Sequence, residues 1–447
     1  MDFHPEAAKR FDEVGTELLQ LVVPCAGEPP PRPNFRPNIY PVADIPEEDI
    51  VGEMRVTRCI VNGMQEEVGR VFFAGKNEFA LVDTGYQALT KLAEQIQSTS
   101  LLRDSVRVEF IRDVVFGWVA ESYRKSTVEP LSVVVLRRVT EEIKEHEIWV
   151  PIHRSYVESP IPMGNVIFQT VSAAMMDTWQ AGARAETKEE EAVLRVFLSK
   201  ERSRLQGCAS ATTKVRAERG KAVEVARYRA GRAAALLRFF SPANWTPKLR
   251  SYCVPLGSEN LGETAELFIE NGRIVNYQRG ALDMRQPAWA FTNAQIAENR
   301  RPLEQLNRLA TEGRKTGYQE ALLDALLLYS RSSIASDPAD KIVYLFAALE
   351  SLLLRNDNEP ITKNLGERMA FMSGKDMSSR KAIVANTSDT YKVRSSFVHH
   401  GNSVGDLETL GVFMVNVWTC FYNALFWQDQ IQDKDQLITA LEDRKLA

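Results

Sequence analysis

The pattern of hydrophobic and polar positions changes along the chain and predicts a mixed α and β architecture. Residues 5–22 have the spacing of an amphipathic helix, with Pro5 in its first turn. From Ile50 to about residue 185, short runs rich in β-branched residues predict strands. From about Tyr318 onward, apolar residues recur at helical spacing. We therefore predict an α+β fold with a β-rich N-terminal domain, a helical connecting arm and a C-terminal all-α bundle.

The β-rich part is expected to begin with a hairpin. Asn62-Gly63 is a tight-turn sequence between two apolar runs, and Gly69 in the second run predicts a bulge. Helical stretches are expected at Leu89–Gln97 and Val114–Tyr123. The predicted strands are Val56–Val61, Met64–Phe73, Phe79–Val82, Ser132–Val139, Glu147–Ile152 and Asn165–Val171.

Two further segments have a distinct composition. Eight of the 20 prolines fall between Pro24 and Pro46, which predicts an extended connector with little regular structure. A capping box at Thr187–Glu190 precedes a long helical segment, and a second helical run is expected from Lys214 to Phe240. A small hairpin is expected around Asn271-Gly272, with strands at Glu266–Ile269 and Arg273–Tyr277. The predicted domains are 1–48 (helix and connector), 49–185 (β-rich, with a sensing or regulatory role), 186–310 (basic helical arm with the small β segment) and 311–447 (helical bundle).

The bundle is expected to contain five or six antiparallel helices. Asp337 and Pro338 provide a cap and a first-turn proline for one of them. Other helices are predicted at Lys363–Met372, Ser379–Ala385 and Ser388–His399, and a long one from Leu407. The eighteen residues Leu410–Trp427 carry no charge, close to the length of a membrane span. Their interior polar residues and helical apolar stripe favour a buried bundle helix, so no membrane association is expected.

Composition agrees with a folded, multi-domain protein. Apolar residues make up 44% of the 447 residues and charged residues 26%. The five cysteines have no ligand-like spacing, and the N-terminus does not resemble a signal peptide, so we expect a cytoplasmic protein without disulfides. The net charge is −4, but Lys200–Arg250 holds 13 Lys and Arg against 3 Glu. This segment is either a helix solvated by basic side chains or a site for a polyanion.

The sequence does not support a phosphate-binding loop or a histidine metal site. Phe73–Lys76 lacks the first glycine and the Ser or Thr of a phosphate-binding loop. His146 and His153 lie seven residues apart, so one strand through both would point them to opposite faces, which disfavours a metal site. We therefore predict no metal and no cofactor.

An arginine and a histidine near the C-terminal end of the chain are a pair of residue types suited to catalysis. Arg394 precedes His399 by five residues near the end of a predicted helix, and His400 follows. Five residues correspond to about 140° around an ideal helix, so the two side chains are not strictly on one face. The length of Arg394, with an unwound last turn before Gly401, is one way for them to meet, and convergence from two chains is another. An imidazole can transfer a proton while a guanidinium holds phosphate oxygens, which suits cleavage of a phosphodiester without a metal. The alternative is an arginine in a structural ion pair and a histidine at a helix C-terminus.

Three segments of residues 318–430 resemble a known family. Phe346–Leu353 (FAALESLL), Glu367–Ala370 (ERMA) and Tyr391–His399 (YKVRSSFVH) are similar, in order and interval, to the conserved helices of the HEPN superfamily, especially its Apea-like branch in prokaryotic defence systems. Ser395 stands where many active members have Asn, and His400 stands where a Gly often follows the histidine.

The resemblance implies a homodimer of helical bundles acting as a metal-independent endoribonuclease in antiviral defence or abortive infection. Arg394 would stabilise the transition state, and His399 or His400 would transfer the proton. Glu350 would orient Arg394 or Arg368, or serve as a structural ion-pair partner. The expected RNA contacts are Arg368, Lys392 and Ser395 in the bundle and Lys214, Arg216, Arg219, Lys221 and Arg227 in the basic arm.

Two hypotheses stay open from the sequence. The first is a toxin-like ribonuclease whose N-terminal region senses a trigger, with a phage-derived trigger or an antitoxin as a further partner. The second is a catalytically silent HEPN module that binds RNA or a nucleotide and pairs two chains.

Overall fold

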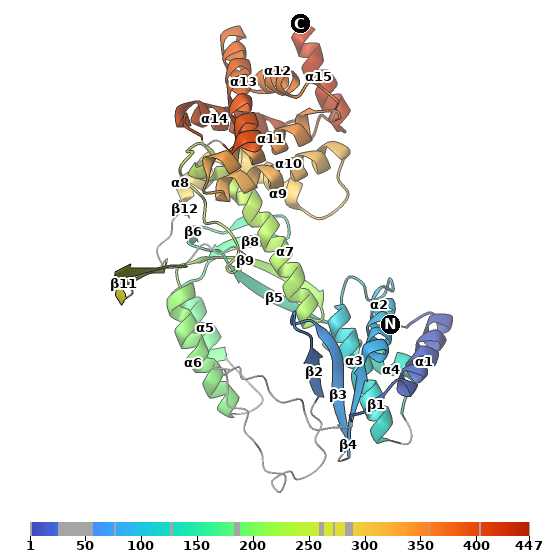
Figure 1. Ribbon diagram of the computed structural model, residues 1–447. Helices are drawn as coiled ribbons and strands as arrows, with labels where there is room; N and C mark the ends of the chain where they lie inside the picture. The colour runs from blue at the N-terminus through green and yellow to red at the C-terminus, as the bar shows by residue number, and fades with distance from the viewer. Residues whose placement is uncertain are drawn as a thin grey trace. The chain divides into compact units, whose positions relative to one another are not determined.

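The computed structural model describes residues 2–25, 57–75, 77–125, 128–182, 188–258, 263–270, 273–281, 289–356, 358–401 and 404–446. Most of the proline-rich connector, Thr187 of the predicted capping box and the Asn271-Gly272 turn lie outside these residues. The fold is α+β, as predicted, and the chain divides into two compact units (Figure 1). Unit 1 consists of Met1–His146 and Val215–Glu224, and unit 2 consists of Glu147–Lys214 and Val225–Ala447. Both units contain residues of the predicted 49–185 segment.

Unit 1 combines a four-stranded antiparallel sheet with helices. The sheet order is β1-β4-β3-β2, and helices α2 and α3 pack on β3. Its apolar core includes Phe72, Leu81, Leu89 and Val115. The elements are α1 (Pro5–Gln20), β1 (Val23–Pro24), β2 (Thr57–Val61), β3 (Glu67–Ala74), β4 (Asn77–Val82), α2 (Asp83–Gln97), α3 (Val108–Arg124) and α4 (Leu131–Glu142).

The predicted first hairpin is confirmed with a longer turn. Asn62 Oδ1 accepts hydrogen bonds from the backbone N–H of Met64 (2.9 Å) and of Glu66 (3.0 Å), so the second strand begins at Glu67 rather than at Met64. Ile60 pairs with Gly69 while Val61 pairs with Glu67, which leaves Val68 as the extra residue of a bulge. The bulge expected at Gly69 therefore lies directly beside it.

The predicted strand Ser132–Val139 is wrong, because this segment forms helix α4. Its valines favour a strand locally, but the buried positions Leu131, Val135 and Val139 recur every four residues and face the core as one helical stripe. Asp12 of α1 accepts hydrogen bonds from both the backbone N–H (2.7 Å) and the hydroxyl (3.0 Å) of Ser132. Tertiary packing and this cap from a distant helix outweigh the local preference.

Unit 2 contains a second sheet, of order β5-β9-β8-β7, and the parallel pair β6 and β12. The predicted strand Glu147–Ile152 corresponds to β5, and Asn165–Val171 corresponds to β8. The predicted small hairpin is β10 and β11, which pair antiparallel. Three of the elements, β5, β9 and α7, include residues of unit 1. The elements are β5 (Lys144–Pro151), β6 (Ser155–Val157), β7 (Ile161–Met163), β8 (Val166–Thr170), α5 (Ala173–Gly182), α6 (Lys188–Leu205), β9 (Ala209–Ala217), α7 (Arg219–Leu237), β10 (Glu263–Glu270), β11 (Arg273–Ala281) and β12 (Trp289–Phe291).

The helix predicted from Lys214 begins later. Residues 214–217 belong to β9, in which Lys214 and Arg216 are exposed while Val215 and Ala217 are buried. This alternation is the period of a strand, whereas the helical period of buried alanines starts at Ala222. The first part of the predicted basic helix is therefore the end of strand β9, with its charges on one face.

The C-terminal part of unit 2 is the predicted helical bundle (Figure 1). Ser379–Ala385 and Ser388–His399 form one helix, α13, instead of two, because the buried Thr387 donates its hydroxyl to the carbonyl of Ile383 and leaves the helix unbroken. The helices are α8 (Asn293–Glu298), α9 (Arg300–Ala310), α10 (Gly317–Ile334), α11 (Pro338–Leu353), α12 (Ile361–Ser373), α13 (Met377–His400), α14 (Leu407–Leu425) and α15 (Lys434–Leu446).

The uncharged stretch of α14 is part of the bundle core. Phe413 stacks on Phe346 of α11 with ring centroids 4.8 Å apart, and Val417 and Phe421 are fully buried. Within the described part of the chain, no helix has the length and apolar character needed to cross a membrane. The prediction of a buried bundle helix is therefore confirmed.

One lysine lies in the apolar core of unit 2. The side chain of Lys341 on α11 is fully buried, and its Nζ donates hydrogen bonds to the carbonyl oxygens of Ala243 (3.3 Å) and Leu249. Burial disfavours the charged form and lowers the pKa of Lys341 from 10.5 to about 8. The folded state therefore binds fewer protons than the unfolded state between about pH 8 and 10.5.

This burial predicts an unusual pH dependence of stability. Because the pKa of Lys341 is lower in the folded state, its contribution to the free energy of unfolding increases as the pH rises from about 8 to 10.5, by about 3 kcal/mol. We expect the free energy of unfolding of the native protein, minus that of Lys341→Met, to rise by this amount in urea titrations from pH 7 to 10.5. The same difference for Lys381→Met, an exposed lysine, should stay flat. A flat difference for Lys341→Met would contradict the burial of the charged form.

Candidate active site

Helices α11 and α13 hold the arginine that the sequence singles out. Arg394 lies on α13, and its Nη1 donates a hydrogen bond to Oε1 of Glu350 on α11 at 2.8 Å. Its guanidinium carbon also lies 5.5 Å from the ring centroids of both Phe346 and Tyr391. Of the two arginines considered for Glu350, the structure therefore pairs it with Arg394 and not with Arg368.

Helical spacing explains this arrangement. Phe346 and Glu350 are four residues apart on α11, and Tyr391 and Arg394 are three apart on α13, so each pair shares a face of its helix. The two aromatic rings were not among the predicted site residues. An aromatic residue one turn before the arginine is a signal that the sequence already contained, because guanidinium groups favour the faces of aromatic rings.

The arginine is partly exposed. The side chain of Arg394 is 22% exposed and that of Glu350 is 25% exposed. The Nε of Arg394 is buried and has no hydrogen-bond partner among the described residues. An ion pair this close to solvent contributes at most about 1 kcal/mol to stability. Its main consequence is orientation, because the carboxylate and the two rings fix a guanidinium that solvent can still reach.

The two histidines lie at the end of α13. The helix continues through His400 and ends at Gly401, which has a φ of 67° and donates its N–H to the carbonyl of Phe397 at 2.8 Å. Of the two ways considered for Arg394 and His399 to meet, unwinding of the last turn is therefore not observed. Both imidazoles are exposed, with ring centroids 6.4 Å apart. At 100° per residue, His399 lies about 140° around the helix from Arg394, so one chain does not bring them onto one face.

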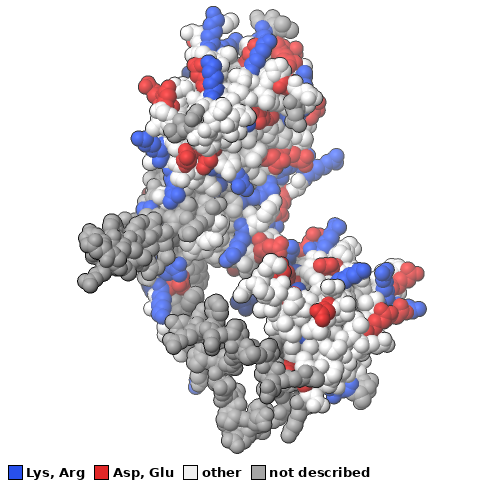
Figure 2. Space-filling view, in the orientation of Figure 1, with Lys and Arg blue, Asp and Glu red and all other residues white. Residues whose placement is uncertain are grey.

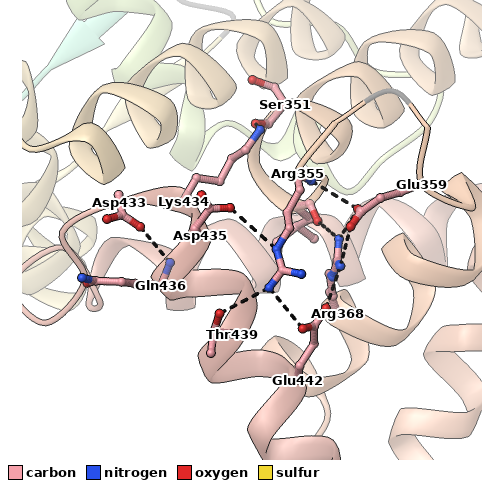
Figure 3. Close-up of polar contacts among 11 residues, drawn as sticks. Ser351, Arg355, Glu359, Arg368, Asp433, Lys434, Asp435, Gln436, Thr439 and Glu442 are labelled. Atoms are coloured by element: carbon pink, nitrogen blue, oxygen red, sulfur yellow. Dashed lines mark hydrogen bonds and ion pairs between the residues drawn. The ribbon is translucent and has the colours of Figure 1, made fainter.

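The other predicted RNA contacts of the bundle differ in exposure. Lys392 is exposed and donates a hydrogen bond to Asp389 at 2.8 Å, and Ser395 is half-buried. Arg368 is buried, with 7% of its side chain exposed, and forms ion pairs with Glu359 (2.6 Å) and Glu442 (2.9 Å) (Figure 3). Its guanidinium is engaged inside the bundle, so we assign Arg368 to the packing of α12 against α15 and leave it out of the proposed RNA contacts.

The basic residues of the arm are divided between the units. Lys214 and Arg227 belong to unit 2, whereas Arg216, Arg219 and Lys221 belong to unit 1. All are exposed except Lys221, which is half-buried and donates a hydrogen bond to Glu224 at 2.8 Å. On the face shown in Figure 2, basic and acidic side chains are interspersed rather than gathered into one basic surface.

The histidine pair considered for a metal does not share a strand. His146 lies in β5, which ends at Pro151, and His153 lies beyond it. His153 is buried and stacks on Tyr252 with ring centroids 5.8 Å apart, and burial lowers the pKa of His153. Over the described residues, no three His, Cys, Asp or Glu side chains come together as a metal site would require.

Comparison of the chain with models of protein families, with curated proteins and with solved structures gives no match. The features of the chain that bear on its function are therefore the local geometry around Arg394 and the three sequence segments that resemble the HEPN superfamily.

Proposed function

We propose that the C-terminal helices form a metal-independent endoribonuclease of the HEPN type that acts in the bacterial cytoplasm in antiviral defence or abortive infection. The observation that supports this most is the orientation of Arg394 by Glu350 and two aromatic rings, five residues before an exposed histidine. This is the segment whose sequence resembles the family. The N-terminal region is proposed to sense a trigger, such as a phage component, or to bind an antitoxin.

The proposed reaction is an internal transesterification. The ribose 2′-hydroxyl attacks the adjacent phosphorus, and its proton passes to an imidazole, His399 or His400. The P–O bond to the 5′-oxygen of the next nucleotide breaks, and this oxygen takes up a proton from an imidazolium. Arg394 donates hydrogen bonds to the non-bridging oxygens as negative charge accumulates on them. The products are a 2′,3′-cyclic phosphate and a 5′-hydroxyl.

The geometry favours a site made by two chains. Since Arg394 faces α11 and His399 lies about 140° away around α13, we propose that the imidazole of one chain joins the guanidinium of another. Exposed apolar side chains support association of this region, namely Val398 on α13 and Val412 and Val415 one turn apart on α14. Helix α13 itself is basic, with Arg380, Lys381, Lys392 and Arg394 against Asp389, which favours an RNA strand.

The direct test is to incubate the protein with single-stranded RNA in excess chelator and to identify the fragment ends. We expect cleavage to persist in the chelator and to give 2′,3′-cyclic phosphates and 5′-hydroxyls, because the proposed groups are all side chains. An RNA with 2′-O-methyl groups should remain intact, since it lacks the attacking hydroxyl. Cleavage of the methylated strand, or fragments with 5′-phosphates, would refute the mechanism.

A second candidate function is a silent module that binds RNA or a nucleotide and pairs two chains. The observation that favours it is the Glu350 carboxylate, which already occupies Nη1 of Arg394. Retention of intact RNA, with no fragments under any buffer condition, would support this function. In both cases Lys214, Arg216, Arg219, Lys221, Arg227, Lys392 and Ser395 are the proposed RNA contacts.

A further inference from the structure

Unit 2 contains a cavity that is separate from the Arg394 site. It has a volume of about 490 Å³ and lies between helices α7 and α10 and the segment 254–258. We call it the arginine cavity, because Arg227, Arg232, Arg238 and Arg331 line it and no Asp or Glu is among its described lining residues. We propose that it binds a small organic phosphate of nucleotide size that carries two or more negative charges.

The positive charge of the arginine cavity comes from arginine side chains of α7, its C-terminal end and α10. Arg227 and Arg331 are exposed, and neither forms an ion pair with a described residue. Arg232 stacks on the ring of Tyr228, with 5.4 Å between its guanidinium carbon and the ring centroid. Four guanidinium groups around one concave space create a strong positive potential, which favours phosphate over a single carboxylate.

A buried arginine anchors the floor of the cavity. Arg238 is 5% exposed and donates hydrogen bonds to the carbonyl of Cys253 (2.7 Å) and to the hydroxyl of Ser330 (3.1 Å). These contacts fix its guanidinium between the segment 254–258 and α10. A side chain that is already held in place before the ligand arrives loses little conformational entropy on binding.

The neighbouring cavity provides a contrast. It has a volume of about 300 Å³ and shares Arg232, but its lining includes Glu312, which accepts hydrogen bonds from both Nε (2.7 Å) and Nη2 (2.8 Å) of Arg229. That charge is neutralised within the protein. The positive charge of the arginine cavity lacks such a carboxylate in its described lining, so an anion from solution is the natural partner.

The size and the remaining lining point to a nucleotide rather than to inorganic phosphate or RNA. The apolar part of the lining is aliphatic and consists of Val254, Pro255, Leu256, Leu327, Leu328 and Ile334. A pocket of this volume encloses one small molecule, and an aliphatic wall suits a base or another flat apolar group. A polynucleotide would instead need a groove that continues past one such cavity.

This proposal is independent of cleavage at Arg394 and is tested by equilibrium binding to the full chain. Calorimetric titrations with ATP, ADP, AMP, pyrophosphate, adenosine and a single-stranded RNA decamer separate the ligand classes. We expect ATP and ADP to bind more tightly than pyrophosphate and AMP, adenosine not to bind, and added salt to weaken binding.

Variants locate the site. Arg227→Glu and Arg331→Glu change exposed residues and should each weaken ADP binding by at least about ten-fold, because each removes a charged donor and adds a repelling carboxylate. Arg314→Glu changes an exposed arginine of unit 2 that neither lines the cavity nor is a proposed RNA contact, and it should leave ADP binding unchanged. Unchanged ADP affinity in both cavity variants would overturn the proposal. The proposal would also be overturned if the RNA decamer bound but none of the nucleotides did, and if Arg219→Glu and Arg227→Glu weakened that binding equally. This result would indicate a binding surface for a polynucleotide.

Discussion

Arg394→Ala is expected to lower the rate of RNA cleavage by about 10²- to 10³-fold, because it removes a preoriented donor from the charge that develops on the phosphate oxygens. The fold should persist, since the pair with Glu350 is partly exposed and contributes at most about 1 kcal/mol. Single-turnover cleavage of a labelled RNA measures the loss, and circular dichroism confirms that the variant is folded.

Matched variants separate charge from geometry. Arg394→Lys keeps the charge but loses the fork of donors, so it should recover only a small part of the activity. Arg380→Ala removes another arginine of α13, which stacks on Phe371 at 4.7 Å, and should leave cleavage nearly unchanged. Equal losses in Arg380→Ala and Arg394→Ala would show a general effect of positive charge and would contradict a specific role for Arg394.

Replacement of His399 and of His400 is expected to have different effects on the rate of RNA cleavage in the same assay. If His399 transfers the proton, His399→Ala should lower cleavage by about 10²- to 10⁴-fold and His400→Ala should change it little. The reverse result would assign the role to His400. Undiminished cleavage when both are replaced would exclude both imidazoles from the chemistry.

Complementation tests whether two chains form one site. An Arg394→Ala chain still provides its histidines, and a His399→Ala chain still provides its arginine. If the site is shared between chains, a mixture of the two inactive variants should regain activity, because one site of each mixed dimer is complete. If each chain contains a whole site, the mixture should stay inactive.

Arg368→Ala is expected to destabilise the bundle by about 3 kcal/mol. Arg368 donates hydrogen bonds to the carbonyl of Leu353 (2.6 Å), to both oxygens of Glu359 (2.6 and 3.0 Å) and to Glu442 (2.9 Å) (Figure 3). Its removal leaves the carboxylate of Glu359 largely buried without its partner. For a unit of about 290 residues the melting temperature should fall by about 5 °C, measured by thermal unfolding.

Arg355→Ala is the matched control. Arg355 contacts the same Glu442 at 3.2 Å and also Thr439 and Asp435, but 36% of its side chain is exposed (Figure 3). Surface pairs of this kind contribute less than about 1 kcal/mol, so its melting temperature should stay close to that of the native protein. Similar losses in the two variants would contradict a special role for the buried guanidinium.

Acid titration provides a second measure of the same network. The hydrogen bond from Arg368 is the main cause that lowers the pKa of Glu359 from 4.5 to about 2. Because the folded-state pKa is lowered, this stabilisation is complete above about pH 4.5 and is lost as the pH falls toward 2. In Arg368→Ala, the loss of stability across this window should be smaller than in the native protein.

Elements with a clear period were predictable from the sequence. The recurrence of apolar residues at helical spacing from about Tyr318 onward predicted the helices of the bundle, and the cap and first-turn proline at Asp337 and Pro338 predicted the start of α11. Ser132–Val139 and residues 214–217 were assigned the wrong element. The composition of Ser132–Val139 favoured a strand and that of residues 214–217 favoured a helix. The structure has the opposite element in each segment, because that element places the buried side chains on one face against the rest of the fold.

The candidate site was predictable only in part, for the same reason. The residue types and their spacing identified Arg394 and His399 as candidate groups and showed the charge of the 200–250 segment, because these are local properties, and the family resemblance added Glu350. The pairing of Arg394 with Glu350 joins residues 44 positions apart, and that of Arg368 with Glu442 joins residues 74 apart. The tertiary structure decided these partners, the exposure of the two imidazoles and the enclosure of four arginines around one cavity. Each depends on which helices pack together, and the apolar period of a helix shows which face is buried but not which distant segment covers that face.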